Sequence, residues 1–127
     1  MIVDTNIAVR HLIGVPEEMA SRATALLDGA ARLLVFDLVV AECVFVLESF
    51  YEWGRPQIAD AMRSLVAMPG AELEDPGRIR LALGLYERWG IGFADACLAA
   101  IGLTSGAPVL SFDRDLDRVP GLERVEP

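Results

Sequence analysis

Hydrophobic positions along the chain follow two patterns, short apolar runs and longer segments with apolar residues at helical spacing. The short runs predict strands at residues 2–3, 33–36, 71–73, 109–112 and 123–125. The longer segments predict helices at residues 5–13, 16–29, 38–53, 56–68, 77–89 and 93–103. Because strands and helices alternate, the pattern predicts an α/β protein with a mostly parallel sheet. No linker, repeat or low-complexity tract interrupts the pattern, so a single domain is expected to fill residues 1–127.

The predicted helix at residues 38–53 is apolar on nearly every face. Asp37 stands just before it and is expected to be its N-cap. A helix that is apolar all round is expected to be buried, either within the domain or partly against another subunit. For Phe45 and Phe50 the sequence leaves both alternatives open, the core and a subunit interface.

Four acidic residues follow the predicted strands directly or lie in the first turns of predicted helices. They are Asp4, Glu42, Asp95 and Asp113. In open parallel sheets these positions meet at one edge, so the four carboxylates are expected to converge there. Carboxylates at such short range repel one another unless a cation binds between them. Mg²⁺ and Mn²⁺ prefer carboxylate oxygens, so the pattern indicates a site for a hard divalent cation.

Each acid also has a purely structural interpretation. Asp4 and Asp95 are candidates for helix caps, and Asp113 is a candidate turn residue. Glu42 is a candidate for an exposed glutamate that the dipole of its helix favours. It has no Lys or Arg close to it in the sequence and lies among apolar residues, which favours a role at a site instead. Asp115 is the alternative to Asp113 as the fourth acid.

Composition narrows the chemistry that remains. The chain contains no lysine, all 11 basic residues are arginine, and His11 is the only histidine. A P-loop, a zinc site built on several histidines and a Ser-His-Asp triad in its usual motif are therefore excluded. Cys43 and Cys97 are expected to be buried, reduced thiols. Carboxylates, hydroxyls and arginine remain as catalytic groups. Thr5 and Asn6 beside Asp4 are candidates either to face the core or cap a helix, or to orient a metal-bound water.

The net charge of −8 argues against nucleic-acid binding through a broad basic face. A polyanionic substrate would need bridging metal ions or local arginines, for which the candidates by position are Arg10, Arg78, Arg80, Arg114 and Arg118. No apolar run is long enough to span a bilayer, and the N-terminus shows no basic segment or cleavage site of a signal peptide. A cytoplasmic protein without membrane contact is expected.

Four segments together resemble the PIN domain family. They are the N-terminal IVDTN, the glutamate of LVVAECVFVL, the segment GFADACLAA and the segment SFDRDLD. In order and spacing they are similar, over essentially the whole chain, to the VapC-type toxins of bacterial toxin–antitoxin pairs. The resemblance implies a PIN-like three-layer α/β fold, in which a short, mostly parallel central sheet is flanked by helices.

The resemblance also implies an activity, a metal-dependent endoribonuclease. It makes Asp4 and Asp95 the main ligands of Mg²⁺ or Mn²⁺, with Glu42 and Asp113 completing the acidic cluster and Thr5 as the site hydroxyl. RNA phosphodiesters would be hydrolysed by a metal-activated water that the cluster holds. The resemblance further implies a homodimer and inhibition by a small cognate antitoxin, whose C-terminal part occupies the acidic cleft.

Two other functions fit the same residues. A PIN-like module with little or no catalysis would use the acidic cleft to bind a partner protein through an arginine-bearing peptide. A metal-dependent nuclease or phosphatase with another substrate would use the same acids. The small size of the chain and the absence of a helical clamp argue against flap cleavage of DNA.

Overall fold

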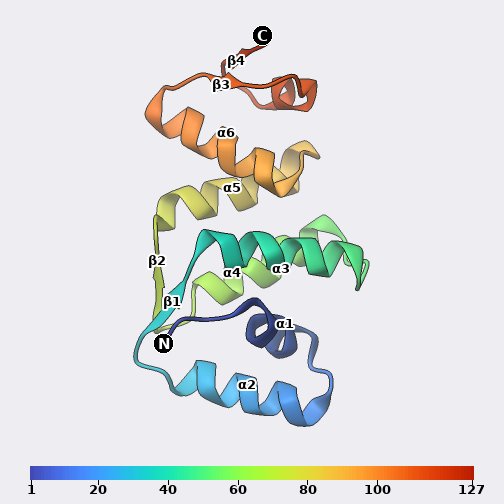
Figure 1. Ribbon diagram of the computed structural model, residues 1–127, viewed down its shortest axis with the longest axis vertical. Coiled ribbons are helices and arrows are strands. Elements are labelled where there is room, and N and C mark those ends of the chain that lie inside the picture. Colours follow the sequence, from blue (N-terminus) through green and yellow to red (C-terminus); the bar gives the residue numbers. More distant parts are fainter. The chain divides into compact units, whose positions relative to one another are not determined.

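A computed structural model describes all 127 residues of the chain, in which helices predominate and the strands are short (Figure 1). The helices are α1 (Thr5–Ile13), α2 (Glu17–Gly29), α3 (Asp37–Ser49), α4 (Arg55–Val66), α5 (Pro76–Trp89), α6 (Phe93–Ser105) and the 3-10 helix η1 (Arg114–Arg118). The strands are β1 (Leu33–Val35), β2 (Ala71–Leu73), β3 (Val109–Leu110) and β4 (Arg124–Val125). Contacts divide the chain into two compact units, Met1–Glu74 and Asp75–Pro127.

The first unit contains α1 to α4 and the parallel pair β1–β2. The register of this pair runs from Leu33 opposite Ala71 to Val35 opposite Leu73. The strand predicted at residues 2–3 is reduced to one parallel bridge, between Ile2 and Leu34. Helix α1 packs against α2 and α3, and α3 packs against α4. The buried side chains of this unit include Val9, Leu33, Val40, Leu47, Ile58 and Met62.

The second unit contains α5, α6, η1 and the parallel pair β3–β4. Helices α5 and α6 pack against each other, and the rings of Tyr86 and Phe93 meet edge to face with centroids 5.9 Å apart. Gly102 brings α6 close to its neighbours, because a Cβ atom there would stand 2.8 Å from Leu122 Cδ1 and 3.1 Å from the Ala107 carbonyl oxygen. Gly102 therefore allows α6 to pack closely against its neighbours.

The α/β class with parallel strands is confirmed. The strands are seen as two parallel pairs, one in each unit. The prediction of a single domain over residues 1–127 stays a prediction. No helix has both the length and the apolar character needed to cross a membrane.

Helix α3 differs from its prediction at both ends and in its burial. Phe36 is the N-cap, and Asp37 is the first helical residue and makes no capping bond, so the predicted role of Asp37 was wrong. The helix ends at Ser49. Only one stripe of α3 is packed inside the unit, whereas Leu38 is 70% exposed and Phe45 is 63% exposed. Burial of the whole helix within the domain was therefore wrong, because one face of a helix suffices to fill the core of this unit.

The two cysteines do not share one environment. Both are free thiols, but Cys43 is buried in α3 whereas Cys97 in α6 is only half-buried. The prediction of buried, reduced thiols is confirmed for Cys43 and was wrong about burial for Cys97. Cys97 lies four residues before Ile101, which is itself exposed, on a part of α6 that the second unit does not fully cover.

Candidate active site

Asp4, Thr5 and Glu42 form the first acid group, which lies in the first unit. Asp4 is the N-cap of α1, and its Oδ2 accepts a hydrogen bond of 3.2 Å from the backbone N–H of Asn6. The structural interpretation of Asp4 as a cap is therefore realised, although the bond uses only one of its carboxylate oxygens. The hydroxyl of Thr5 donates a hydrogen bond of 2.6 Å to Oε2 of Glu42, which fixes the carboxylate of α3 against the start of α1.

A pocket of ≈ 440 Å³ lies over this acid group. Four-residue spacing places Glu42, Val46 and Phe50 along one stripe of α3, and this stripe forms one wall. Helix α1 forms the other wall, to which Asn6 and Arg10 contribute at the same spacing. The pocket thus joins two carboxylates, one guanidinium and exposed aromatic surface within the first unit.

The first acid group also affects a neighbouring thiol. Burial raises the pKa of Cys43 to about 12, and the negative charges of Glu42 and Asp4 add to the increase. The thiol therefore stays protonated at neutral pH, and a protonated thiol is neither a nucleophile nor a metal ligand. Cys43 acts as a packed apolar side chain beneath the acids.

Asp95, Asp113 and Asp115 form the second acid group, which lies in the second unit. Asp95 is the third residue of α6, whose N-cap is Gly92, so the structural interpretation of Asp95 as a cap was wrong. Asp113 caps η1, where its Oδ1 accepts a hydrogen bond of 2.9 Å from the backbone N–H of Asp115. The backbone N–H of Asp113 in turn donates to the Ser111 hydroxyl over 2.9 Å, which fixes the start of η1.

Asp95 holds its proton more tightly than an ordinary aspartate does. Burial raises the pKa of Asp95, and the hydrogen bond with Asp113 and the charges of Asp113 and Asp115 raise it further. Asp115 instead faces Arg118, whose Nη2 is 3.1 Å from Asp115 Oδ1. These contacts favour Asp113 over Asp115 as the partner of Asp95, since the carboxylate of Asp115 is already paired.

Replacing Asp95 with asparagine is expected to stabilise the metal-free protein at neutral pH and to change nothing at acidic pH. The pKa of Asp95 is higher in the folded than in the unfolded state, so the wild type loses stability as the pH rises through the window between the two values. Asparagine does not titrate and escapes this loss. Thermal unfolding in EDTA from about pH 4 to about pH 7 measures the effect as a gap in Tm that widens with pH.

The matched control for this measurement is Asp28→Asn, which removes an exposed carboxylate of α2 that has no hydrogen-bond or ion-pair partner. The Tm of this variant is expected to differ from that of the wild type by the same amount across the pH range. A gap that is equally constant for Asp95→Asn would show that Asp95 has an ordinary pKa.

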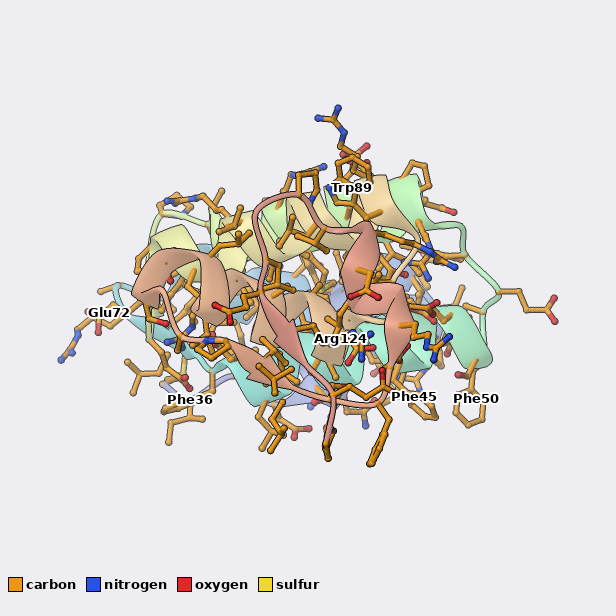
Figure 2. All side chains as sticks on the ribbon, turned by 90° about the horizontal axis from the view of Figure 1, so that it is seen from above. Phe36, Phe45, Phe50, Glu72, Trp89 and Arg124 are labelled. Atoms are coloured by element: carbon orange, nitrogen blue, oxygen red, sulfur yellow. The ribbon has the colours of Figure 1, made fainter.

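Two arginines hold the segment that carries Asp113. Arg124 on β4 binds both carboxylate oxygens of Asp117 in η1, over 2.8 Å and 2.9 Å, and donates to the Ser111 carbonyl oxygen over 2.9 Å. Figure 2 labels Arg124. Arg118 donates to the Gly90 carbonyl oxygen over 3.2 Å and so connects η1 to the loop before α6. Arg118 is therefore engaged within the chain, whereas its sequence position had made it a candidate for substrate binding.

The structure places the predicted site residues in two groups that belong to different units, Asp4, Thr5 and Glu42 in one and Asp95 and Asp113 in the other. None of the charged side chains is buried. No set of three or more His, Cys, Asp or Glu side chains is arranged as a metal site. The donors that each group does offer are carboxylate oxygens, which suit a hard divalent cation.

Sequence reasoning did not assign Phe50 and Tyr51 to the site, yet both line the pocket over Asp4 and Glu42. A usable signal was present, because Phe50 follows Glu42 by eight residues and so falls on the same stripe of a helix. The core alternative for Phe50 was wrong, since its side chain is 75% exposed.

Comparison with known proteins identifies the family. The family model described as PIN domain matches residues 1–122. The chain therefore belongs to the PIN domain family, as the four sequence segments predict. Members of this family are generally nucleases and generally use divalent metal ions. No curated protein matches the chain.

One similar solved structure is the crystal structure of VapBC2 from Rickettsia felis bound to a DNA fragment from their promoter. The two sequences are 17% identical, and the match covers 98% of this chain and 96% of that chain with a TM-score of 0.40. A likeness at this level carries no argument about activity or partners.

Proposed function

We propose that this PIN domain protein is a Mg²⁺- or Mn²⁺-dependent endoribonuclease and acts as the toxin of a toxin–antitoxin pair. The observation that carries the proposal is the match to the PIN family over residues 1–122, combined with acid groups formed by the same four residues that the motifs single out. The narrower assignment to the VapC-type toxins rests on the sequence motifs IVDTN, GFADACLAA and SFDRDLD.

Asp4, Glu42, Asp95 and Asp113 would hold the metal, as the resemblance of the sequence motifs implies. These four residues suit Mg²⁺ or Mn²⁺ because all of them offer carboxylate oxygens and none is a soft ligand such as a thiolate. When bound, the metal supplies a water that is acidic enough to act as a nucleophile at neutral pH and stabilises charge on the phosphate.

The residues of the chain account for positioning and for proton transfer. The Thr5 hydroxyl fixes Oε2 of Glu42, so the other carboxylate oxygen of Glu42 has a defined direction in which to accept a proton. The charge of Asp113 helps to raise the pKa of Asp95, so a cation bound beside these two carboxylates would relieve the repulsion between them. No histidine is required, in agreement with a chain whose only histidine, His11, is bonded to Thr24.

The partners in the proposal are RNA, a second copy of the chain and an antitoxin in the cytoplasm. The exposed apolar side chains of Leu38 and Phe45 on α3 support a homodimer, because the first unit leaves them without cover. The antitoxin follows from the resemblance to VapC-type toxins.

Cleavage of total cellular RNA by the isolated protein tests the function. Discrete products are expected with Mg²⁺ and with Mn²⁺, and none with EDTA. Single-stranded DNA and a small phosphodiester serve as comparison substrates. Cleavage of DNA or of the small ester in preference to RNA would make the protein another kind of metal-dependent hydrolase. Absence of cleavage on all three would favour a protein-binding module.

A further inference from the structure

We propose that the pocket between α1 and α3 holds a nucleotide of single-stranded RNA, with Phe50 stacking on the base and Arg10 contacting a phosphate. The inference rests on the proposed ribonuclease function and says how a chain with a net charge of −8 engages a polyanion. Asp4 and Glu42 line the same pocket, so a nucleotide bound there lies beside the first acid group.

Phe50 presents a ring that the core of the first unit does not use. Its backbone N–H donates to the Val46 carbonyl oxygen over 2.9 Å, so the backbone continues the geometry of α3. Its side chain is nevertheless 75% exposed, and Figure 2 shows it projecting outward from the ribbon. Tyr51 adds a second ring to the pocket wall. Exposed aromatic rings are platforms on which unpaired bases stack.

Arg10 is the only basic residue that lines the pocket, and it pairs with neither carboxylate. Its Nη1 donates to the Val15 carbonyl oxygen over 3.0 Å, while its Nε is buried without any hydrogen-bond partner. A guanidinium has five N–H donors, so most of those on Arg10 have no partner in the protein. A phosphate oxygen is the acceptor that suits such a group, because the bond is charge-assisted.

The combination of ring and guanidinium favours RNA over a peptide. Charge alone does not choose between them, because Asp4 and Glu42 attract an arginine-bearing peptide and repel a phosphate, whereas Arg10 does the opposite. The acid group does not account for the exposed ring of Phe50 or for the guanidinium of Arg10. A nucleotide would use both, because its base stacks on Phe50 and its phosphate contacts Arg10. The RNA must be unpaired, because bases inside a duplex cannot reach a side-chain ring.

Fluorescence anisotropy of a labelled octauridylate, in EDTA and in Ca²⁺, tests the pocket through binding and not through cleavage. Phe50→Ala is expected to weaken binding about ten-fold, which is about 1.4 kcal/mol. Arg10→Gln is expected to weaken binding as well and to reduce the slope of log affinity against log salt by about 0.7, the value for one phosphate contact on a single strand. Phe50→Ala should leave that slope unchanged.

Two variants serve as matched controls. Phe36→Ala removes another exposed ring of the first unit, one that does not line the pocket. Arg22→Gln removes an exposed arginine of α2 that is also outside the pocket. Both controls are expected to bind the octamer as the wild type does. Thermal unfolding checks that all four variants remain folded.

Wild-type affinity in both pocket variants would overturn the proposal, and so would a wild type that binds the octamer in neither buffer. The proposal would also be overturned if the two pocket variants lost binding to an arginine-containing octapeptide but still bound RNA as the wild type does. The pocket would then be a peptide site. Pocket-dependent binding without any cleavage would leave the pocket standing and refute the ribonuclease. If the protein cleaves RNA but both pocket variants bind the octamer normally, the ribonuclease function stands and the pocket proposal is refuted.

Discussion

Asp95→Asn and Asp4→Asn are each expected to abolish metal-dependent RNA cleavage while leaving the protein folded. The loss should be at least about 100-fold, because even groups that only support metal ligands cost 10- to 100-fold when removed. Each substitution replaces a charged oxygen ligand by a neutral amide of the same size. Asn can keep the α1 capping bond that Asp4 makes, since asparagine is as good an N-cap as aspartate.

The measurement is the rate of product formation from a defined RNA in Mg²⁺, with Asp28→Asn as the control that removes the same charge elsewhere. A second readout is the rise in Tm on adding Mg²⁺, which is expected for the wild type and for Asp28→Asn but not for Asp95→Asn. Cleavage at the wild-type rate by both site variants would refute the assignment of these residues. An unchanged Mg²⁺ response in Asp95→Asn would place the metal elsewhere.

Arg124→Met is expected to lower Tm by several degrees and to impair cleavage. The substitution keeps the length of the side chain but removes the forked bond to Asp117 and the bond to the Ser111 carbonyl oxygen, which together hold η1 beside β3. Because the backbone N–H of Asp113 bonds to the hydroxyl of Ser111, loss of Arg124 also loosens the acid that pairs with Asp95.

The matched control is Arg32→Met. Arg32 makes the same forked pair with Glu72, over 2.7 Å and 2.9 Å, but its side chain is 72% exposed, whereas that of Arg124 is 10% exposed. Exposed ion pairs contribute little, so Arg32→Met should leave Tm and cleavage nearly unchanged. If Arg124→Met and Arg32→Met lowered Tm and cleavage equally, the exposure of the ion pair would not explain its contribution.

The effect of Arg124→Met should also depend on pH. The hydrogen bond with Arg124 and the charge of Arg124 lower the pKa of Asp117 in the folded protein. A lowered pKa contributes stability above the unfolded value, and that stability is lost as the pH falls through the folded value. The difference in Tm between Arg124→Met and the wild type should therefore shrink on acidification.

The sequence by itself determined the elements that carry their own boundary signals. Helix α1 runs over the predicted residues because Asp4 caps its start and Gly14, in the left-handed conformation with φ 76°, ends it. Local signals of this kind depend on residues a few positions apart. For the same reason the sequence located the four acids at the ends of strands and the first turns of helices.

Only the tertiary structure decided which of those acids meet. The bond from Thr5 to Glu42 spans 37 positions, and the hydrogen bond between Asp95 and Asp113 joins a helix to a separate loop. No local pattern encodes such pairings, because they depend on how elements pack. The environment of Arg124, which distinguishes it from Arg32, is likewise a property of the packed second unit.

Helix α3 shows the same division within one element. The sequence predicted a helix there, but an element that is apolar on every face does not reveal which face is covered. The packing of α3 against α1 and α4 buried the stripe with Val40, Val44 and Leu47. The same packing left Phe50 exposed over the acids, so a ring that reads as core in the sequence lines the pocket in the fold.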